Sequence, residues 1–200
     1  MDLWAFEKKV IRKGFTVIAG IDEAGRGPLA GPVVAAAVIL PRRFRVARMA
    51  DSKQLTPKRR SEVYEIICRK AVGVGIGIID PCEIDRINIF QAALAAMAVA
   101  VENLNPRPLY LLIDGKFPIY CDLPQEPIVK GDTLSISIAA ASIVAKVTRD
   151  RLMEQYHDLY PHYGFDRHKG YATACHRKAI QDFGPCPIHR ASFKGVREYC

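Results

Sequence analysis

Two neighbouring carboxylates, Asp22 and Glu23, are the residues of this chain best suited to chemistry. They follow an apolar segment, residues 17–21, and the segment Gly25-Arg26-Gly27 comes just after them. Neighbouring carboxylates that are partly buried repel each other and resist ionisation unless a cation holds them. Glycine also lets a backbone come close to a ligand. The segment therefore predicts a divalent metal site beside an anionic substrate.

Two further aspartates lie in separate parts of the chain, each at one end of a predicted element. Asp114 ends the apolar run at residues 109–114, and Asp132 precedes a long helical pattern. Ligand sites in α/β sheets gather at strand ends, so four acids could meet there and hold two Mg²⁺ or Mn²⁺ ions. Such a pair of ions can activate water and stabilise the leaving oxygen of a phosphodiester. In a simpler interpretation, Asp114 is a turn residue and Asp132 caps the following helix.

Basic residues cluster next to the segments that carry these acids. They are Arg26, Lys53, Lys116, Lys130, His168 and Lys169. Tyr171 adds an aromatic ring, and rings interleaved with cations suit stacking on nucleic acid. Surface lysines and arginines are, however, usually just solvated. The glycines at 25–31 have neither the G-x-G-x-x-G spacing nor a Walker lysine, which argues against a nucleotide-cofactor loop.

Composition limits the class of protein. The chain has 200 residues, which fit one domain, and its net charge of +8 favours a polyanionic partner such as nucleic acid. It has no apolar run long enough to cross a bilayer and no signal peptide pattern, so we expect no membrane partner. The six scattered cysteines form no C-x-x-C pair, and we interpret them as reduced in an intracellular, cytoplasmic protein. Nothing indicates an obligate oligomer, so we expect a monomer.

Hydrophobic patterns predict a mixed α/β sheet with helices on both faces. We expect strands at residues 16–22, 32–40, 72–79, 109–114 and 127–129, and helices from 57, at 88–104, 134–156 and 172–183. The uninterrupted apolar run at 33–39 predicts a strand covered on both faces, and the short link to the first strand predicts that the two pair antiparallel.

Two expectations concern particular side chains. Because successive side chains of a strand alternate, we expect the first strand to end or kink between Asp22 and Glu23. On the long helix, Lys146, Arg149, Asp150 and Arg151 begin a charged section. We interpret that section as a solvated face of ion pairs.

The motifs together resemble those of bacterial ribonuclease HII, the type 2 ribonuclease H family. The resemblance runs in order from about Thr16 to Phe193 and no single motif carries it. The matching stretches are Gly20-Ile21-Asp22-Glu23-Ala24-Gly25-Arg26-Gly27, Asp51-Ser52-Lys53-Gln54-Leu55, Ile113-Asp114-Gly115, Lys130-Gly131-Asp132, residues 138–150 and His168-Lys169-Gly170-Tyr171.

This resemblance implies an RNase H-like fold for a single domain, 1–200, with a C-terminal helical extension at about 160–200. It implies an endonuclease that cleaves the RNA of RNA–DNA hybrids and incises 5′ to ribonucleotides in duplex DNA, leaving 5′-phosphate and 3′-OH ends. By the same resemblance, Asp22, Glu23, Asp114 and Asp132 hold two Mg²⁺ or Mn²⁺ ions. Residues Gly25, Arg26 and Gly27 contact the ribose 2′-OH and its phosphates, Tyr171 packs on the next deoxyribose, and nearby lysines such as Lys53 hold phosphates.

Three other functions stay open on the sequence. A metal-dependent DNA nuclease or strand-transfer enzyme of the same fold would also use carboxylates and two metals. A non-catalytic nucleic-acid-binding module would explain the charge but not four acids, which repel phosphate unless metal is present. A dinucleotide-dependent enzyme fits least, because of the glycine spacing.

Overall fold

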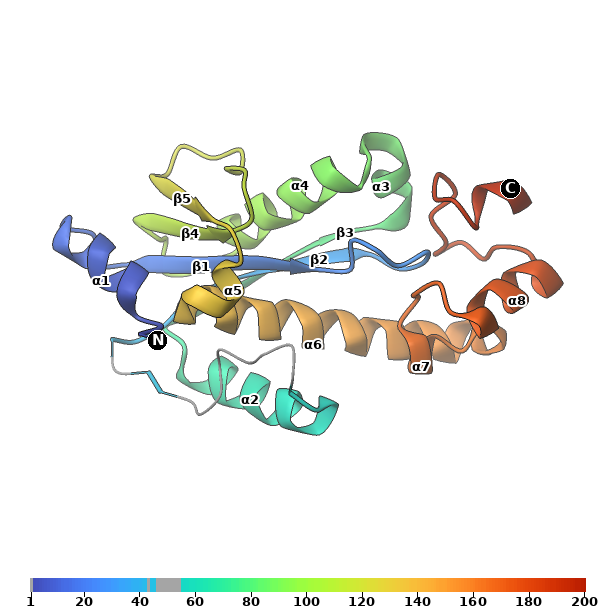
Figure 1. Cartoon of the computed structure of the whole chain (residues 1–200), viewed down its shortest axis with the longest axis horizontal. Coiled ribbons are helices and arrows are strands. Elements are labelled where there is room, and N and C mark those ends of the chain that lie inside the picture. Colours follow the sequence, from blue (N-terminus) through green and yellow to red (C-terminus); the bar gives the residue numbers. More distant parts are fainter. Residues whose placement is uncertain (1, 43, 46–54) are drawn as a thin grey trace.

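A five-stranded mixed sheet lies at the centre of the structure, a computed structural model that describes residues 2–42, 44–45 and 55–200 (Figure 1). The strands are β1 (Ile18–Ala24), β2 (Val33–Ile39), β3 (Gly73–Ile79), β4 (Tyr110–Asp114) and β5 (Gln125–Ile128). Their order across the sheet is β3-β2-β1-β4-β5. The pairs β1–β2 and β2–β3 are antiparallel, whereas β1–β4 and β4–β5 are parallel.

Helices cover both faces of this sheet (Figure 1). α3 (Pro81–Ile87) and α4 (Ile89–Glu102) pack on one face, and α2 (Pro57–Lys70) and α6 (Ile136–Leu159) pack on the other. α1 (Ala5–Arg12) packs against β1, β4 and the start of α6. The shorter elements are α5 (Gly131–Leu134), η2 (Pro161–Tyr163), α7 (Phe165–His168), α8 (Ala174–Phe183) and η3 (Arg197–Tyr199). A separate cluster of buried side chains joins the end of α6 to α7 and α8.

A close contact joins β1 to α6. A side-chain carbon on Gly20 would lie 2.1 Å from the backbone carbon of Ser137, which is far too short for any real contact. The first turns of this helix are also rich in small residues, since Ala139, Ala140 and Ala141 are fully buried. Glycine on the strand and alanine on the helix therefore let the two backbones approach, and α6 fixes the side chains that flank β1.

A buried carboxylate anchors the start of α6. Glu7 of α1 is 1% exposed, and its Oε1 accepts hydrogen bonds from the Ser135 hydroxyl at 2.6 Å and the Ser137 backbone N–H at 3.1 Å. Ser135 is also the N-cap of α6, because its side chain accepts from the Ile138 N–H. A negative charge at a helix N-terminus is favourable, so Glu7 ties α1 to the long helix.

Most predicted elements are confirmed, including the mixed sheet, the antiparallel first pair and a β2 buried on both faces. Thr56 and Asn88 cap α2 and α4 through side-chain hydrogen bonds. The expected break between Asp22 and Glu23 is wrong, because β1 continues through both residues to Ala24, paired with β2 throughout. Capping of the long helix by Asp132 is also wrong, since Asp132 lies inside α5 and Ser135 is the cap.

The structure also describes the apolar helices and the cysteines. No helix among the described residues is long and apolar enough to span a membrane. All six cysteines are free thiols, as expected. The cytoplasmic location stays a prediction.

Replacing Glu7 with alanine should lower the free energy of unfolding by about 2–3 kcal/mol, because two buried donors lose their acceptor and α6 loses a charge at its N-terminus. Urea unfolding followed by circular dichroism measures the change. The control is Glu102→Ala at the exposed end of α4, expected to change stability by less than about 0.5 kcal/mol. Equal effects of the two substitutions would contradict an anchoring role for Glu7.

Candidate active site

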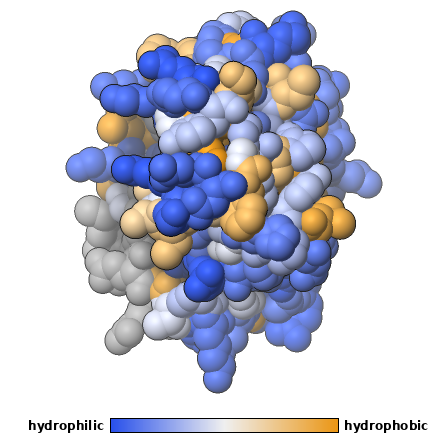
Figure 2. Space-filling model, turned by 90° about the vertical axis from the view of Figure 1, so that its right-hand side faces the viewer, coloured by the Kyte–Doolittle hydropathy of each residue, from blue (hydrophilic) through white to orange (hydrophobic). Residues whose placement is uncertain are grey.

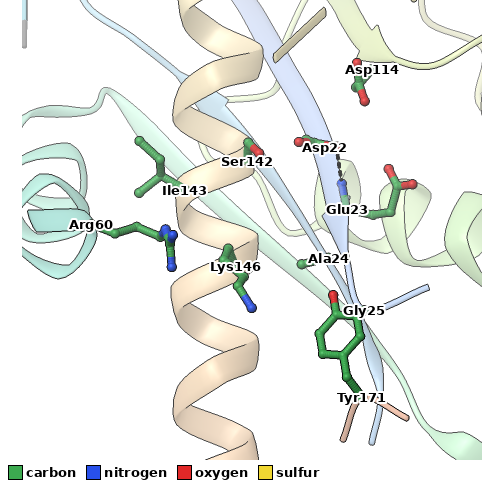
Figure 3. Close-up of a pocket in the computed structure, with 10 residues that line it drawn as sticks. All are labelled: Asp22, Glu23, Ala24, Gly25, Arg60, Asp114, Ser142, Ile143, Lys146 and Tyr171. Atoms are coloured by element: carbon green, nitrogen blue, oxygen red, sulfur yellow. Dashed lines mark hydrogen bonds between the residues drawn. The ribbon is translucent and has the colours of Figure 1, made fainter. Parts of the chain in front are cut away.

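Three of the four predicted carboxylates line one cavity of about 400 Å³ between β1, β4 and α6 (Figure 3). The lining residues are Asp22, Glu23, Ala24, Gly25, Arg60, Asp114, Ser142, Ile143, Lys146 and Tyr171. Acids therefore lie on the sheet side of this cavity. Cations lie on its helical side, with Arg60 on α2 and Lys146 on α6.

Asp22 and Glu23 point to opposite sides of β1, as strand geometry requires (Figure 3). Asp22 faces α6, where the nearby Ser142 lowers its pKa in part, and its Oδ1 accepts the Glu23 N–H at 2.7 Å. Glu23 reaches the same cavity because the neighbouring strand ends. The pairing of β1 with β4 stops at Ile21–Ile113, so the edge of β1 beyond that pair is not covered by β4. At this open edge both side chains can therefore reach the same cavity, and the strand needs no kink.

Asp114, the last residue of β4, stands across that edge. Its Oδ1 accepts the Gly131 backbone N–H at 2.6 Å, which joins β4 to the start of α5. Asp132 is the next residue along and is 1% exposed. It does not line the cavity, so the structure places it beside the site but not in it. Its role as a fourth metal ligand stays a prediction.

The electrostatics of the cavity fit a cation. Burial, followed by the charges of Glu23 and Asp114, raises the pKa of Asp22 well above its ordinary value. Burial also raises the pKa of Glu23, although Arg26, 3.2 Å away, lowers it in part. Among the described residues, the buried Oε2 of Glu23 has no hydrogen-bond donor. A positive ion would relieve the repulsion and supply that oxygen with a partner.

The donors suit a hard divalent ion that also binds substrate. Across the described residues, no three His, Cys, Asp or Glu side chains converge closely enough to hold one ion alone. Magnesium usually takes one or two carboxylates and completes its shell with water and phosphate oxygens. The carboxylates of Asp22, Glu23 and Asp114 fit that mode of binding, with room left for substrate.

Two buried arginines hold the glycine loop that follows β1. Arg149 of α6 donates to the carbonyls of Ala30, Pro32 and Lys169 at 2.9–3.0 Å. Arg190 donates to the carbonyls of Gly25, Arg26 and Gly31 at 2.6–3.0 Å. Both side chains are 0% exposed. The carbonyls of the loop are therefore fixed toward the protein interior by two guanidinium groups.

Gly25 is required by this arrangement. Its φ is +98°, and a side-chain carbon would lie 2.1 Å from Nε of Arg149.

Burial lowers the pKa of Arg149 to about 10 and that of Arg190 to about 9, so both stay charged at neutral pH. The loop at 25–27 thus lies over two positive charges, which favours an anionic ligand.

Arg149 corrects one interpretation of the sequence. We expected it on a solvated face with Asp150, but it is completely buried. Asp150 itself forms the expected ion pair, with Lys146 at 2.7 Å. The buried positions Ala145 and Met153 are four residues before and after Arg149, so helical spacing was the signal for its burial. Arg190 lies in an irregular tail without such periodicity.

Three histidines hold the segment that carries Tyr171. His168 Nε2 contacts the Tyr163 carbonyl at 2.7 Å, and its Nδ1 accepts the Gly170 N–H at 3.2 Å. His176 Nδ1 lies 2.9 Å from the Tyr171 carbonyl, and its Nε2 lies 3.0 Å from Nε2 of His189. A carbonyl only accepts, so His176 donates to Tyr171 and accepts from His189.

The network requires neutral imidazoles. His189 Nδ1 accepts the Cys186 N–H at 2.9 Å, so each ring has one donor and one acceptor in use. Burial lowers the pKa of His176 and of His189 to about 4. A second proton on either ring would put a donor against a donor and release the segment at 168–171.

Comparison with known proteins identifies the family. The family model for ribonuclease HII matches residues 19–196. The chain belongs to the ribonuclease HII family. Ribonuclease HII of Geobacter sulfurreducens is 58% identical over 197 residues, covering 98% of this chain and 91% of that protein. The predicted class, a ribonuclease H enzyme, is confirmed.

Solved structures agree on the fold. The crystal structure of ribonuclease H2 from Pyrococcus horikoshii OT3 has a TM-score of 0.77 at 26% identity, covering 92% of this chain and 97% of that one. Bst-RNase HIII in complex with Mn²⁺ has a TM-score of 0.72 at 19% identity, covering 92% and 68%, and supports the fold alone. The predicted RNase H-like fold is therefore confirmed.

The remaining predicted site residues lie in different places. Gly25 and Tyr171 line the cavity, and a side-chain carbon on Gly27 would lie 3.9 Å from the Tyr171 ring. Arg26 pairs with Glu23 and does not line the cavity. Lys53 lies outside the described residues. Sequence patterns assigned no role in the site to Arg60, Ser142 or Lys146, which join it only because α6 packs beside β1 and α2 packs beside α6.

Replacing Arg190 with lysine should lower the free energy of unfolding by about 2–4 kcal/mol, because an ammonium group cannot reach three carbonyls and leaves buried acceptors without donors. Thermal and urea unfolding measure the loss. The matched control is Arg197→Lys at an exposed position, which should leave stability unchanged. A tolerated Arg190→Lys would show that the loop at 25–31 does not depend on the guanidinium.

Acidification should destabilise the C-terminal region. His176 and His189 bind a proton near pH 6.5 when unfolded but only near pH 4 when folded, so stability is full above 6.5 and falls as pH drops toward 4. Each histidine contributes a slope of up to about 1.4 kcal/mol per pH unit in that window. Unfolding curves from pH 7 to 4 measure the slope, which should be smaller in His176→Phe and unchanged in His162→Phe, a control at an exposed ring.

Proposed function

We propose that this ribonuclease HII relative incises duplex DNA 5′ to an embedded ribonucleotide and cleaves the RNA of RNA–DNA hybrids, leaving 5′-phosphate and 3′-OH ends. The observation that carries the proposal is the cavity that joins Asp22, Glu23 and Asp114 to Gly25 and Tyr171. One group of residues can hold metal and the other can contact a sugar. Neither group alone would explain selective hydrolysis.

Asp22, Glu23 and Asp114, with Asp132 as the fourth, would hold two Mg²⁺ or Mn²⁺ ions. When bound, the ions supply an activated water and stabilise the leaving 3′ oxygen. One structural relative, Bst-RNase HIII, was solved in complex with Mn²⁺, an ion of the class proposed here. The Glu23 N–H donates to the Asp22 carboxylate, and Ser142 on α6 lies beside it, so both groups favour the charged form of this ligand side chain.

Selectivity for ribose would come from the loop at 25–27. An enzyme that distinguishes RNA from DNA at one nucleotide must contact the 2′-OH. Arg149 and Arg190 hold the carbonyls of this loop inward, so the loop is rigid and lies over two positively charged guanidinium groups. Arg26 is exposed and pairs with Glu23 at 3.2 Å, and a substrate phosphate would compete with that pair.

Tyr171 would set the position of the substrate. The residue is 45% exposed and lines the cavity, with the Lys146 ammonium 5.8 Å from the ring centre. A sugar packed on the ring would have its phosphate near Lys146. We also propose that the region at about 160–200 belongs to one catalytic domain, 1–200, and contributes to substrate binding through this residue.

A gel assay tests the proposal with duplex DNA that contains one ribonucleotide, an RNA–DNA hybrid and an all-DNA duplex. The protein with Mg²⁺ should cut the first 5′ to the ribonucleotide and cut the second within its RNA. It should leave the third intact, and EDTA should stop all cleavage. Cutting of all-DNA duplex would favour a DNA nuclease of the same fold.

Asp22→Asn or Asp114→Asn should lower cleavage by at least about a thousandfold, because each removes a charged metal ligand. Duplex binding and thermal stability should be nearly retained. The matched control, Asp158→Asn at the exposed end of α6, should cut like the parent chain. Near-normal turnover by either cavity variant in Mg²⁺ would show that the metal assignment is wrong.

A further inference from the structure

A second cavity lies next to the active site. It has a volume of about 460 Å³ and lies between the start of α2, the middle of α6 and α7. Its lining residues are Pro57, Arg60, Ser61, Lys146, Val147, Asp150, Arg151, Glu154, Asp166, Arg167 and Lys169, and we call it the α2–α7 groove. None of the predicted metal ligands belongs to it.

The α2–α7 groove continues from the active-site cavity. Arg60 and Lys146 line both cavities. On α6, Ser142, Lys146 and Asp150 are four residues apart and therefore lie along one side of the helix. That side leads from Asp22 at one end to the groove at the other.

Cations of the groove are held in place by hydrogen bonds. The Lys169 ammonium pairs with Glu154 at 2.8 Å, and Lys146 pairs with Asp150 at 2.7 Å. Arg60 donates to the Leu55 carbonyl at 2.9 Å. For Arg60 and Arg167, the described part of the chain provides no carboxylate partner within ion-pair distance. These two arginines keep a positive charge that an external anion can use.

We propose that the α2–α7 groove binds the phosphodiester backbone of the duplex beside the cut, with Arg60 and Arg167 as its phosphate contacts. The proposal rests on the proposed function, because a duplex cut at Asp22 must continue past Lys146. A cationic groove that follows a nucleic-acid backbone binds it without regard to sequence. The paired lysines position the backbone, and the two arginines add affinity.

The surface chemistry favours a polyanion over an apolar partner. The end of the molecule that carries α7 and α8 is mainly hydrophilic, with hydrophobic residues in separate patches (Figure 2). The groove itself is lined mostly by charged side chains. Three carboxylates in it, Asp150, Glu154 and Asp166, offset part of the positive charge. Binding should therefore be moderate and sensitive to salt.

Binding to an all-DNA duplex tests the groove without any cleavage. Arg60→Gln and Arg167→Ala should each raise Kd about three- to tenfold and reduce the slope of log Kd against log salt by about one. Glutamine keeps a polar side chain at this position and is a good helix former, which protects the fold. The controls are Arg59→Gln, the exposed neighbour on α2, and Arg177→Ala, an exposed position on α8, which remove the same charge outside the groove.

The same variants are then compared on duplex with one ribonucleotide. For Arg167→Ala, which lines the groove but not the active-site cavity, KM should rise by the same factor as Kd while kcat stays constant, because phosphate contacts away from the cut stabilise bound substrate and transition state equally. Unchanged Kd and salt slope in both groove variants, or equal effects in the controls, would overturn the proposal. If the parent chain fails to cut at a ribonucleotide yet the slopes change, the proposed function is wrong and the groove stands.

Discussion

The close contact between β1 and α6 determines how the rest of the site is built. Because Gly20 has no side chain, the helix backbone lies directly against the strand that carries Asp22 and Glu23. From that contact, one turn of helix places Ser142 beside Asp22, the next places Lys146 at the cavity, and Arg149 lies beneath Gly25. An α-helix is stiff over this length. The distance between metal ligands, loop and groove is therefore set by one rigid element.

The buried acids and the buried arginines near this contact differ in their hydrogen-bond partners. The carboxylates of Asp22 and Glu23 are brought together with few donors, which raises their pKa values. The guanidinium groups of Arg149 and Arg190 each donate to three backbone carbonyls instead of carboxylates. Backbone acceptors satisfy these donors without cancelling their charge. The site thus keeps acids that need a cation next to a loop that attracts an anion.

Local patterns predicted the elements well where the relevant signal was local. The helices that begin near 57 and 88, the apolar run of β2 and the strand ending at Asp114 all depend on neighbours in sequence. The convergence of Asp22 with Asp114 followed from the rule that ligands bind at strand ends. How Glu23 reaches the same cavity without a break in β1 was missed, because it depends on where β4 stops pairing with β1. That is a property of register between strands far apart in the sequence.

Arg190 and the three histidines show why the supporting residues were harder to find. Each acts on a backbone group, which is far away in sequence for Arg190 and the Gly25 carbonyl but only five residues away for His176 and the Tyr171 carbonyl. Backbone partners leave no mark in residue identity, so no pairing of side-chain types could indicate them. The same reasoning explains why Tyr171 was recognisable and its support was not. A ring that contacts substrate must be a particular residue, whereas the carbonyl that holds it in place belongs to every residue equally.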